Sequence, residues 1–400
     1  MTSQLIILGN GFDVHCGLKS KYQDFFRSVI LDTIGEVYGL KQLQAGVSGF
    51  WESLLLEYYK LNNKDDYKWC DIEKIIKDTL LTIYFGSDSL DKNINQGIYG
   101  KAAKYLNNFT VGLGLEKLNS IEKFLFDYCV KFISTNGNGF IETLKSLIGH
   151  FLQQLYNLEK RFCKYLKNQI VNPCNKSERN EEYIINAVNL LASITGFAYY
   201  KFNKIDDFIT SESKKYLIDV FDNLNDTFIL NFNYTALFDI LEVESPCFHN
   251  NVHGKLCGNV CVNGCESNII FGIDDNLIQS QGASSELRLF SKTYRKMLSS
   301  DKYSTVLPPN ENNPIAIKFY GHSLSEADYS YFQSIFDYYD LYGNGNVSLT
   351  FYYSKGFENY DAVYKLISEY GKSLTNREQG KNLIHKLLLE NRLHISEIKE

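Results

Sequence analysis

A glycine-rich turn near the start of the chain is the first place where the sequence could do chemistry. Gly9-Asn10-Gly11-Phe12-Asp13 comes directly after the short apolar run 5–8, which is typical of a buried parallel strand. Glycines let a backbone turn tightly and approach a phosphate group, and the start of a following helix favours negative charge. The turn predicts a nucleotide-binding loop, with an ordinary steric turn as the alternative.

This turn departs from the dinucleotide fingerprint of dehydrogenases. Val14 occupies the position of the third glycine in that fingerprint. No second strand with an acidic end follows about 20 residues later, as the fingerprint requires. These departures disfavour an enzyme that transfers hydride.

Polar side chains also follow two later apolar segments. One group comes after segment 227–230 and the other after segment 315–320, and each precedes a helical pattern. Open α/β sheets bind ligands at the carboxyl ends of their strands, although the same residue types also cap helices. We therefore expect a ligand site to include these residues: Asn231, Asn233, Thr235, Gly321, His322, Ser323 and Asp328.

His253 ends a short predicted strand and is followed by Gly254, which lets the chain turn beside the imidazole. A neutral imidazole can act as a general base near pH 7. A structural histidine is the alternative interpretation. Because three polar junctions and one histidine fall at the ends of strands that we infer to be neighbours, together they predict one site.

A cysteine cluster follows this histidine. Cys257, Cys261 and Cys265 recur every four residues in a glycine-rich loop, with Cys247 and His249 upstream. Paired Cys-x-x-Cys knuckles are missing, so we expect no metal, and a structural zinc ion at the three cysteines is the alternative. The chain has nine cysteines in 400 residues, an odd and scattered set that is typical of reduced thiols in a cytoplasmic protein.

The elements that must position these residues alternate between strands and helices. Segments 227–232, 269–272, 315–320 and 347–353 are rich in β-branched or aromatic residues and are bounded by turn residues. Helical patterns at 235–242 and 326–339 lie between them, which favours a parallel sheet. The predicted fold class is α/β, a Rossmann-like parallel sheet that includes segment 5–8.

A long helical region interrupts this alternation. Apolar residues recur three and four positions apart in segment 151–166, which predicts one buried helix face. The predicted organisation is a Rossmann-like nucleotide-binding domain over 1–40 and 226–356, a helical insertion over 41–225, and C-terminal helices over 357–400. Within the last part, 376–400 is expected to be one charged amphipathic helix.

Composition excludes several classes of protein. Hydrophobic residues make up 44% and charged residues 22%, which indicates a folded globular chain. The net charge of −6 leaves no basic footprint, so nucleic acid is not an expected partner. No segment approaches the roughly 20 apolar residues that cross a bilayer, and the first residues do not form a signal peptide. We expect a cytoplasmic protein that does not bind membranes.

Several motifs, taken in order, resemble the AbiH-type abortive-infection proteins of bacteria. They are segment 5–17, Trp69-Cys70-Asp71-Ile72-Glu73, 231–235, 252–254, 269–274 and 321–328. That family is in turn remotely similar to the sirtuin superfamily, which includes NAD-degrading domains of antiphage systems. The resemblance implies an antiphage effector with NAD or a related nucleotide as substrate or ligand. It also implies a phage-derived trigger or a partner defence protein, and a homo-oligomer is a further candidate assembly.

The similarity to sirtuins implies roles for individual residues. Asn233 falls on the asparagine that positions the nicotinamide ribose and the attacking water, and His253 falls on the histidine of the His-Gly motif. Segment 9–13 falls on the phosphate loop, and 321–324 on a turn that contacts the nucleotide. Asn10, Asp13 and Thr235 depart from the superfamily pattern. The implied reaction is hydrolysis of the nicotinamide glycosidic bond, with Asn233 and His253 as catalytic residues.

Two other functions are compatible with the sequence. The departures at Asp13 and Thr235 favour a nucleotide-sensing or protein-binding defence module without catalysis. A toxin that attacks nucleic acid is the third hypothesis, and the net charge and the lack of a clustered acidic metal site count against it. A protein deacylase is disfavoured because nothing clearly corresponds to the two paired-cysteine knuckles of the sirtuin zinc module.

Overall fold

A computed structural model describes most of the chain, in two compact units. The described residues are 3–27, 49–61, 71–85, 97–108, 113–137, 139–170, 180–196, 226–236, 248–256, 268–274, 285–298, 307–310 and 314–398. The first unit comprises Met1–Lys21, Leu166–Ile269 and Ser299–Glu400, and the second comprises Tyr22–Tyr165 and Ile270–Leu298.

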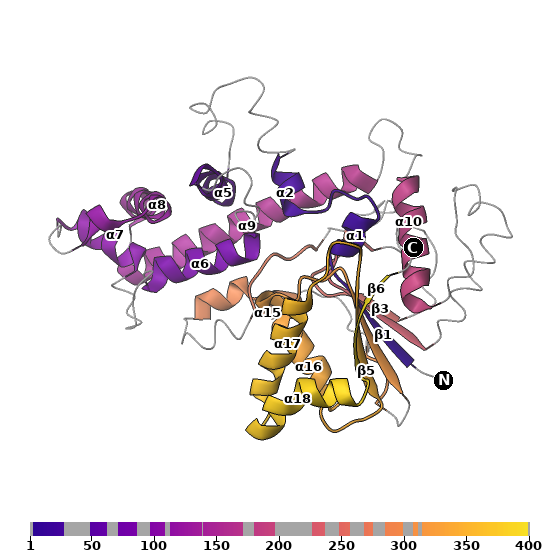
Figure 1. Cartoon of the computed structure of the whole chain (residues 1–400). Helices are drawn as coiled ribbons and strands as arrows, with labels where there is room; N and C mark the ends of the chain where they lie inside the picture. The colour runs from indigo at the N-terminus through magenta and orange to yellow at the C-terminus, as the bar shows by residue number, and fades with distance from the viewer. Residues whose placement is uncertain are drawn as a thin grey trace. The chain divides into compact units, whose positions relative to one another are not determined.

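The first unit is built on a six-stranded parallel sheet (Figure 1). Its strands are β1 (Ser3–Leu8), β2 (Thr227–Asn231), β3 (Phe248–Asn251), β4 (Ile315–Tyr320), β5 (Val347–Tyr353) and β6 (Leu393–Glu397). Their order across the sheet is β3-β2-β1-β4-β5-β6. This arrangement confirms the predicted α/β class with a Rossmann-like parallel sheet.

The apolar run of the first strand explains its central place. Leu5, Ile6 and Ile7 of β1 are fully buried, so both faces of this strand are covered. β1 pairs with β2 on one side and with β4 on the other. The chain therefore builds outward from β1 in both directions, and the strand order reverses between β1 and β4. Open α/β sheets bind ligands at such a switch point, outside the carboxyl ends of the strands.

Helices cover both faces of this sheet. On one face, α16 (Tyr329–Tyr338), α17 (Tyr360–Ser373) and α18 (Arg377–Leu389) pack their apolar residues against the strands (Figure 1). Side chains alternate between the faces of a strand, so Lys318 of β4 points to the other face. There its ammonium donates hydrogen bonds to the carbonyls of Ile194 and Thr195, at the end of α10 (Glu181–Thr195). Burial lowers the pKa of Lys318.

The second unit consists mainly of helices. They are α2 (Tyr22–Phe25), α5 (Phe50–Leu61), α6 (Ile72–Phe85), α7 (Ile98–Leu106), η3 (Leu115–Lys117), α8 (Ser120–Asn136), α9 (Phe140–Ile170), η4 (Ser285–Phe290) and α15 (Lys292–Leu298). The residues of α9 from Leu166 onward belong to the first unit. Trp51 is buried in the core, where its ring nitrogen donates to the carbonyl of Phe151 at 2.9 Å. The apolar stripe predicted over 151–166 is the buried side of α9.

Several predicted elements differ from the structure. Segment 269–272 was expected to be a strand, but it joins no ladder, and only Ile273 forms an isolated bridge, with Ser291. Segment 376–400 is not one helix, because α18 ends at Leu389 and β6 follows as the edge strand of the sheet. Most of segment 235–242, for which a helix was expected, lies outside the described residues.

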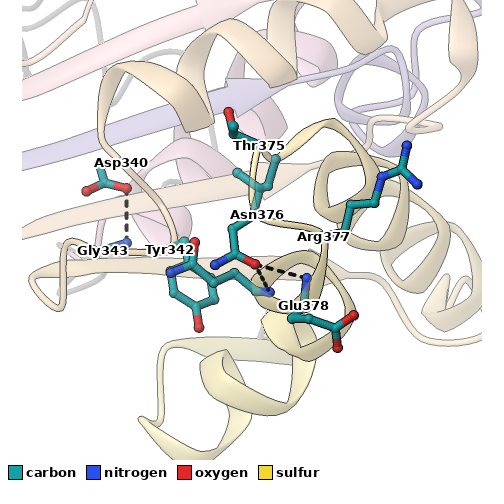
Figure 2. A pocket seen from close by; sticks show the side chains of 9 residues that line it. Asp340, Tyr342, Gly343, Thr375, Asn376, Arg377 and Glu378 are labelled. Carbon is teal, nitrogen blue, oxygen red and sulfur yellow. Dashed lines mark hydrogen bonds between the residues drawn. The ribbon is translucent and has the colours of Figure 1, made fainter.

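A cavity of about 710 Å³ (Figure 2) lies near the amino ends of the strands, whereas the predicted site lies at their carboxyl ends. Its lining comes from the loop before β5, including Asp340 and Tyr342, and from the connection between α17 and α18. The side chain of Asn376 accepts hydrogen bonds from the backbone of Glu378 and Gln379 and so caps α18. The polar groups here serve the turn and the helix start, and the cavity is separate from the carboxyl ends of the strands.

None of the helices in the described part of the chain is both long enough and apolar enough to cross a membrane.

Candidate functional site

The loops after β1 and β4 are locked together at the switch point. The N–H of Gly9 donates to the carbonyl of Tyr320 at 2.9 Å, and the N–H of Gly11 donates to that of Gly321 at 2.7 Å. A Cβ on Gly9 would lie 2.3 Å from Cα of His322, and Gly321 has a φ of +68°. The glycines are therefore required for close contact between two backbones. This contact alone explains why glycines occur at these positions, and no ligand is needed to explain them.

Asp13 lies under this loop in a buried network. Its carboxylate accepts hydrogen bonds from the hydroxyl of Thr235, at 2.9 and 2.8 Å, and from that of Tyr183 at 2.9 Å. Burial raises the pKa of Asp13 to about 6, and the two hydrogen bonds oppose that shift. Asp13 and Thr235 are thus direct partners of each other.

Two asparagine side chains shape the loop that follows β2. Asn231 accepts a hydrogen bond from the N–H of Asn233 and donates to the carbonyl of Thr235. Asn251, at the end of β3, donates to the carbonyls of Asn233 and Thr235. Both side chains are buried, and their polar groups form hydrogen bonds with the backbone of this loop. Asn231 therefore holds the loop in place.

The side chain of Asn233 has a different environment. Asn233 is 2% exposed, and within the described residues neither its amide nitrogen nor its amide oxygen has a hydrogen-bond partner. A buried polar group without a partner costs about 1–3 kcal/mol of stability. Two such groups on one side chain, at the carboxyl end of β2, are what a site for a polar ligand would leave when no ligand is present.

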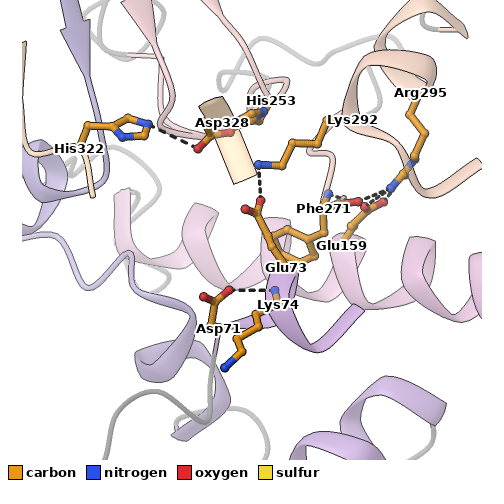
Figure 3. A network of polar contacts seen from close by, with 10 residues as sticks. All are labelled: Asp71, Glu73, Lys74, Glu159, His253, Phe271, Lys292, Arg295, His322 and Asp328. Carbon is orange, nitrogen blue, oxygen red and sulfur yellow. Dashed lines mark hydrogen bonds and ion pairs between the residues drawn. The ribbon is translucent and has the colours of Figure 1, made fainter. Parts of the chain in front are cut away.

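A carboxylate lies between two histidines at the same edge of the sheet (Figure 3). Nε2 of His253 lies 2.9 Å from Oδ1 of Asp328, and Nε2 of His322 lies 3.4 Å from Oδ2. The rings of His253 and His322 pack edge-on to the ring of Phe232, with centroid distances of 5.3 and 4.6 Å. His253 follows β3 and His322 follows β4, while Asp328 precedes α16. All three side chains are buried.

The other predicted site residues have varied positions. Asn10 is exposed and accepts a hydrogen bond from the hydroxyl of Ser20, whereas Phe12 is buried edge-on to Tyr320. Ser323 is exposed. The predicted residues thus divide into the interlocked glycine loops, the Asp13–Thr235 pair, the loop after β2, and the group of His253, His322 and Asp328.

The cysteines considered for zinc, Cys247, Cys257, Cys261 and Cys265, lie outside the described residues. In the part of the chain that the structure describes, no group of three or more His, Cys, Asp or Glu side chains could hold a metal ion.

A cluster that the sequence analysis missed adjoins the β1 and β4 loops. Nδ1 of His15 lies 2.8 Å from the hydroxyl of Ser354 and 2.7 Å from that of Tyr320, and the two hydroxyls are 2.6 Å apart. Ser354 directly follows β5. The rule that polar residues at strand ends gather at one edge would have found it. Tyr183, the partner of Asp13, gave no such signal because it lies on a helix far away in the sequence.

Residues 71–73 and 270–274, from two motifs of the sequence, lie in the second unit (Figure 3). Asp71 caps α6 by accepting a hydrogen bond from the N–H of Lys74, and Glu73 pairs with Lys292 at 2.6 Å. In segment 269–274, the N–H of Phe271 donates to Glu159, which also binds both terminal nitrogens of Arg295. The charged groups here are paired within the unit.

The model of a known protein family matches most of this chain. A search of curated proteins found no similar chain, and a search of solved structures found no match either. The family model described as bacteriophage abortive infection AbiH matches residues 5–353, from β1 to the end of β5. This match includes each of the groups at the carboxyl edge of the sheet except Ser354. The chain therefore belongs to the bacteriophage abortive infection AbiH family.

Proposed function

We propose that this AbiH protein carries out its abortive-infection role by hydrolysing the nicotinamide glycosidic bond of NAD or a related nucleotide. Membership of the family supports the antiphage role. The observation that carries the enzymatic part is Asn233, a buried amide whose nitrogen and oxygen both lack partners among the described residues. Its position beside the switch point is where an α/β sheet binds nucleotides.

The chemistry of these residues suits such a substrate. The Asn233 amide offers one acceptor and two donors, which match ribose hydroxyls and a water molecule. In the proposed reaction the bond from C1′ of the ribose to nicotinamide breaks, and its electron pair leaves with nicotinamide. The oxygen of water bonds to C1′, and the proton of that water passes to the imidazole of His253. Asn233 would orient the water or the ribose.

Binding without catalysis is the second candidate function, and one observation favours it. The N–H groups of Gly9 and Gly11 donate hydrogen bonds to backbone carbonyls of the β4 loop, and the hydroxyl of Thr235 donates to Asp13. Fewer donors are then directed to a phosphate than in a loop dedicated to phosphate binding. A defence module that senses a nucleotide or a protein would need no more than this.

The test is to incubate the purified protein with NAD, NADP, ATP and GTP and to follow each nucleotide by chromatography. Asn233→Ala and His253→Ala serve as site variants. His385→Gln is the matched control, because His385 is exposed on α18. Release of nicotinamide by the parent and the control, together with at least a 100-fold slower release by both variants, supports hydrolysis.

Intact nucleotides would contradict the hydrolase proposal for the isolated protein. If one nucleotide then raises the melting temperature of the parent but not that of Asn233→Ala, the sensing function is favoured. If no nucleotide is altered and none raises the melting temperature, hydrolysis and nucleotide sensing at this edge of the sheet are both wrong, and only recognition of a protein is left.

A further inference from the structure

The two histidines that share Asp328 differ in what fixes them. Nδ1 of His322 accepts a hydrogen bond from the N–H of Leu324 at 2.9 Å. A ring nitrogen that accepts carries no proton, so neutral His322 has its proton on Nε2, which lies toward Oδ2 of Asp328. Leu324 has a φ of +56°, an uncommon conformation for a residue other than glycine. The turn after β4 is therefore shaped to aim His322 at Asp328.

We propose that Asp328 is a positioning residue that, together with His322, orients His253. Oδ1 of the carboxylate lies 2.9 Å from Nε2 of His253 without forming a hydrogen bond to it in the described structure, and its negative charge favours the neutral tautomer with the proton on that nitrogen over the tautomer with a lone pair there. The lone pair of the ring is then at Nδ1. This inference rests on the proposed function only for its catalytic consequence, because the tautomer is a property of the resting protein.

The same arrangement has a consequence for proton transfer. When Nδ1 of His253 takes a proton from water, the ring becomes an imidazolium beside the buried carboxylate, which stabilises the positive charge. Nε2 of His322 lies 3.4 Å from the second oxygen of Asp328, so its N–H dipole favours the orientation of the carboxylate that the structure has. Phe232 contacts both rings and limits their rotation. Asp328 therefore acts through His253 without touching the substrate.

The direct test is ¹⁵N NMR of the protein labelled in its histidines, without nucleotide. His253→Gln identifies the signals of His253, because they disappear from its spectrum. We expect His253 of the parent to have a protonated Nε2 and an unprotonated Nδ1 at pH 8. The opposite tautomer in the parent would overturn the inference, whatever the activity of the protein.

Asp328→Asn extends the test to the reaction. Its side chain is the same size but neutral, so we expect a mixture of the two tautomers of His253 in its spectrum. We also expect nicotinamide release with about 100-fold lower kcat and nearly unchanged KM. Asp361→Asn, at an exposed position of α17, should change neither. An unchanged His253 spectrum or an unchanged kcat in Asp328→Asn would contradict the positioning role.

Failure of the positioning inference can be told apart from failure of the proposed reaction. If the parent cleaves no nucleotide but its His253 has the expected tautomer and Asp328→Asn loses it, Asp328 positions His253 and the hydrolase proposal is wrong. If the parent releases nicotinamide and the tautomer does not depend on Asp328, the reaction stands and the positioning role is wrong.

Discussion

At the scale of single residues, Asn231 and Asn233 of one loop differ in what their side-chain amides bind. The side chain of Asn231 bonds to the backbone at Asn233 and Thr235, so it has the role of a structural clamp. Asn233 is just as buried, yet its amide lacks a partner among the described residues. Proteins retain such unfavourable groups where binding requires them.

We therefore expect opposite effects from the same substitution at these two positions. Asn233→Leu replaces an unpartnered amide with an apolar group of similar size and should raise the free energy of unfolding by about 1 kcal/mol. Asn231→Leu removes two buried hydrogen bonds and should lower it by about 2 kcal/mol or more. Urea denaturation measures both. An Asn233→Leu variant that is less stable than the parent would show that the Asn233 amide has hydrogen-bond partners in the folded protein.

Asp13 gives a prediction on pH. Burial raises its pKa from 3.8 to about 6, so the folded protein holds this proton more tightly than the unfolded chain does. The resulting stabilisation is fully present below pH 3.8 and is lost as the pH rises through 6. Asp13→Asn does not titrate and can still accept from Tyr183 and Thr235. At pH 8 it should therefore be more stable than the parent by up to about 3 kcal/mol.

The measurement for Asp13 is denaturation of parent and variant between pH 4 and pH 8. The exposed Asp127 of α8 provides the control, and Asp127→Asn should follow the parent at every pH. If Asp13→Asn is destabilised at pH 8 while it keeps its fold, then the charge of Asp13 stabilises the native state and our account of its burial is wrong.

At the scale of elements, the site depends on the contact between the loops after β1 and β4. Their backbones touch at Gly9, Gly11 and Gly321, and the contact places His322 beside the end of β1. A strand-to-helix turn with two glycines is common, and the sequence alone offers either a ligand or close packing as the reason. Here close packing is sufficient.

Alanine substitutions at two glycines separate these reasons. Gly9→Ala would bring a Cβ within 2.3 Å of a backbone atom of His322, so the loops would have to separate, at a cost of about 3 kcal/mol or more. Gly17→Ala meets no atom within 4 Å, but its φ is +91°, and we expect a loss of only about 1–2 kcal/mol. Thermal denaturation compares them. Equal losses of stability would mean that the loops can move apart without cost.

At the scale of the whole molecule, the AbiH match spans residues of both units, and each unit has its own buried core. In the second unit, Glu159 and Arg295 are 4% and 6% exposed and are joined by two hydrogen bonds of 2.7 Å. Burial raises the pKa of Glu159, which the bonds to Arg295 oppose. Breaking such a pair leaves a buried charge without compensation.

Glu159→Gln should destabilise the protein by about 3–5 kcal/mol for this reason. Hydrogen exchange followed by mass spectrometry should show faster exchange in α9 and α15. Glu326→Gln is the control, because its partner Lys365 and Glu326 itself are both largely exposed, and it should cost less than about 1 kcal/mol. A Glu159→Gln variant as stable as this control would show that the buried pair contributes little.

More of the fold than of the candidate site could be predicted from the sequence. The strands at 227–231, 315–320 and 347–353 follow from continuous or alternating apolar runs, which a parallel sheet requires. Segment 269–272 has the same composition but is buried without pairing, and composition does not distinguish these cases. The edge strand β6 is half-buried in its first three residues, exposed in its last two and lacks an apolar run, so the helical pattern before it was extended over it.

For the site, the positions of strand ends predicted that His253, His322 and Asp328 lie at one edge of the sheet, where the structure has them. They did not predict which of these side chains contact one another. Pairing depends on side-chain directions, such as the turn at Leu324 that aims His322, and a sequence carries no direct signal of these. Tyr183 could not be predicted because its contact with Asp13 joins residues 170 positions apart.

The most direct test of the central claim is to quantify NAD and nicotinamide in phage-infected cells that carry the parent protein, Asn233→Ala or the control His385→Gln. The infected cell supplies any trigger that the isolated protein lacks. We expect NAD to fall and nicotinamide to rise with the parent and the control, and we expect Asn233→Ala to lose both this change and the protection. Protection by the parent with NAD left intact would contradict the claim.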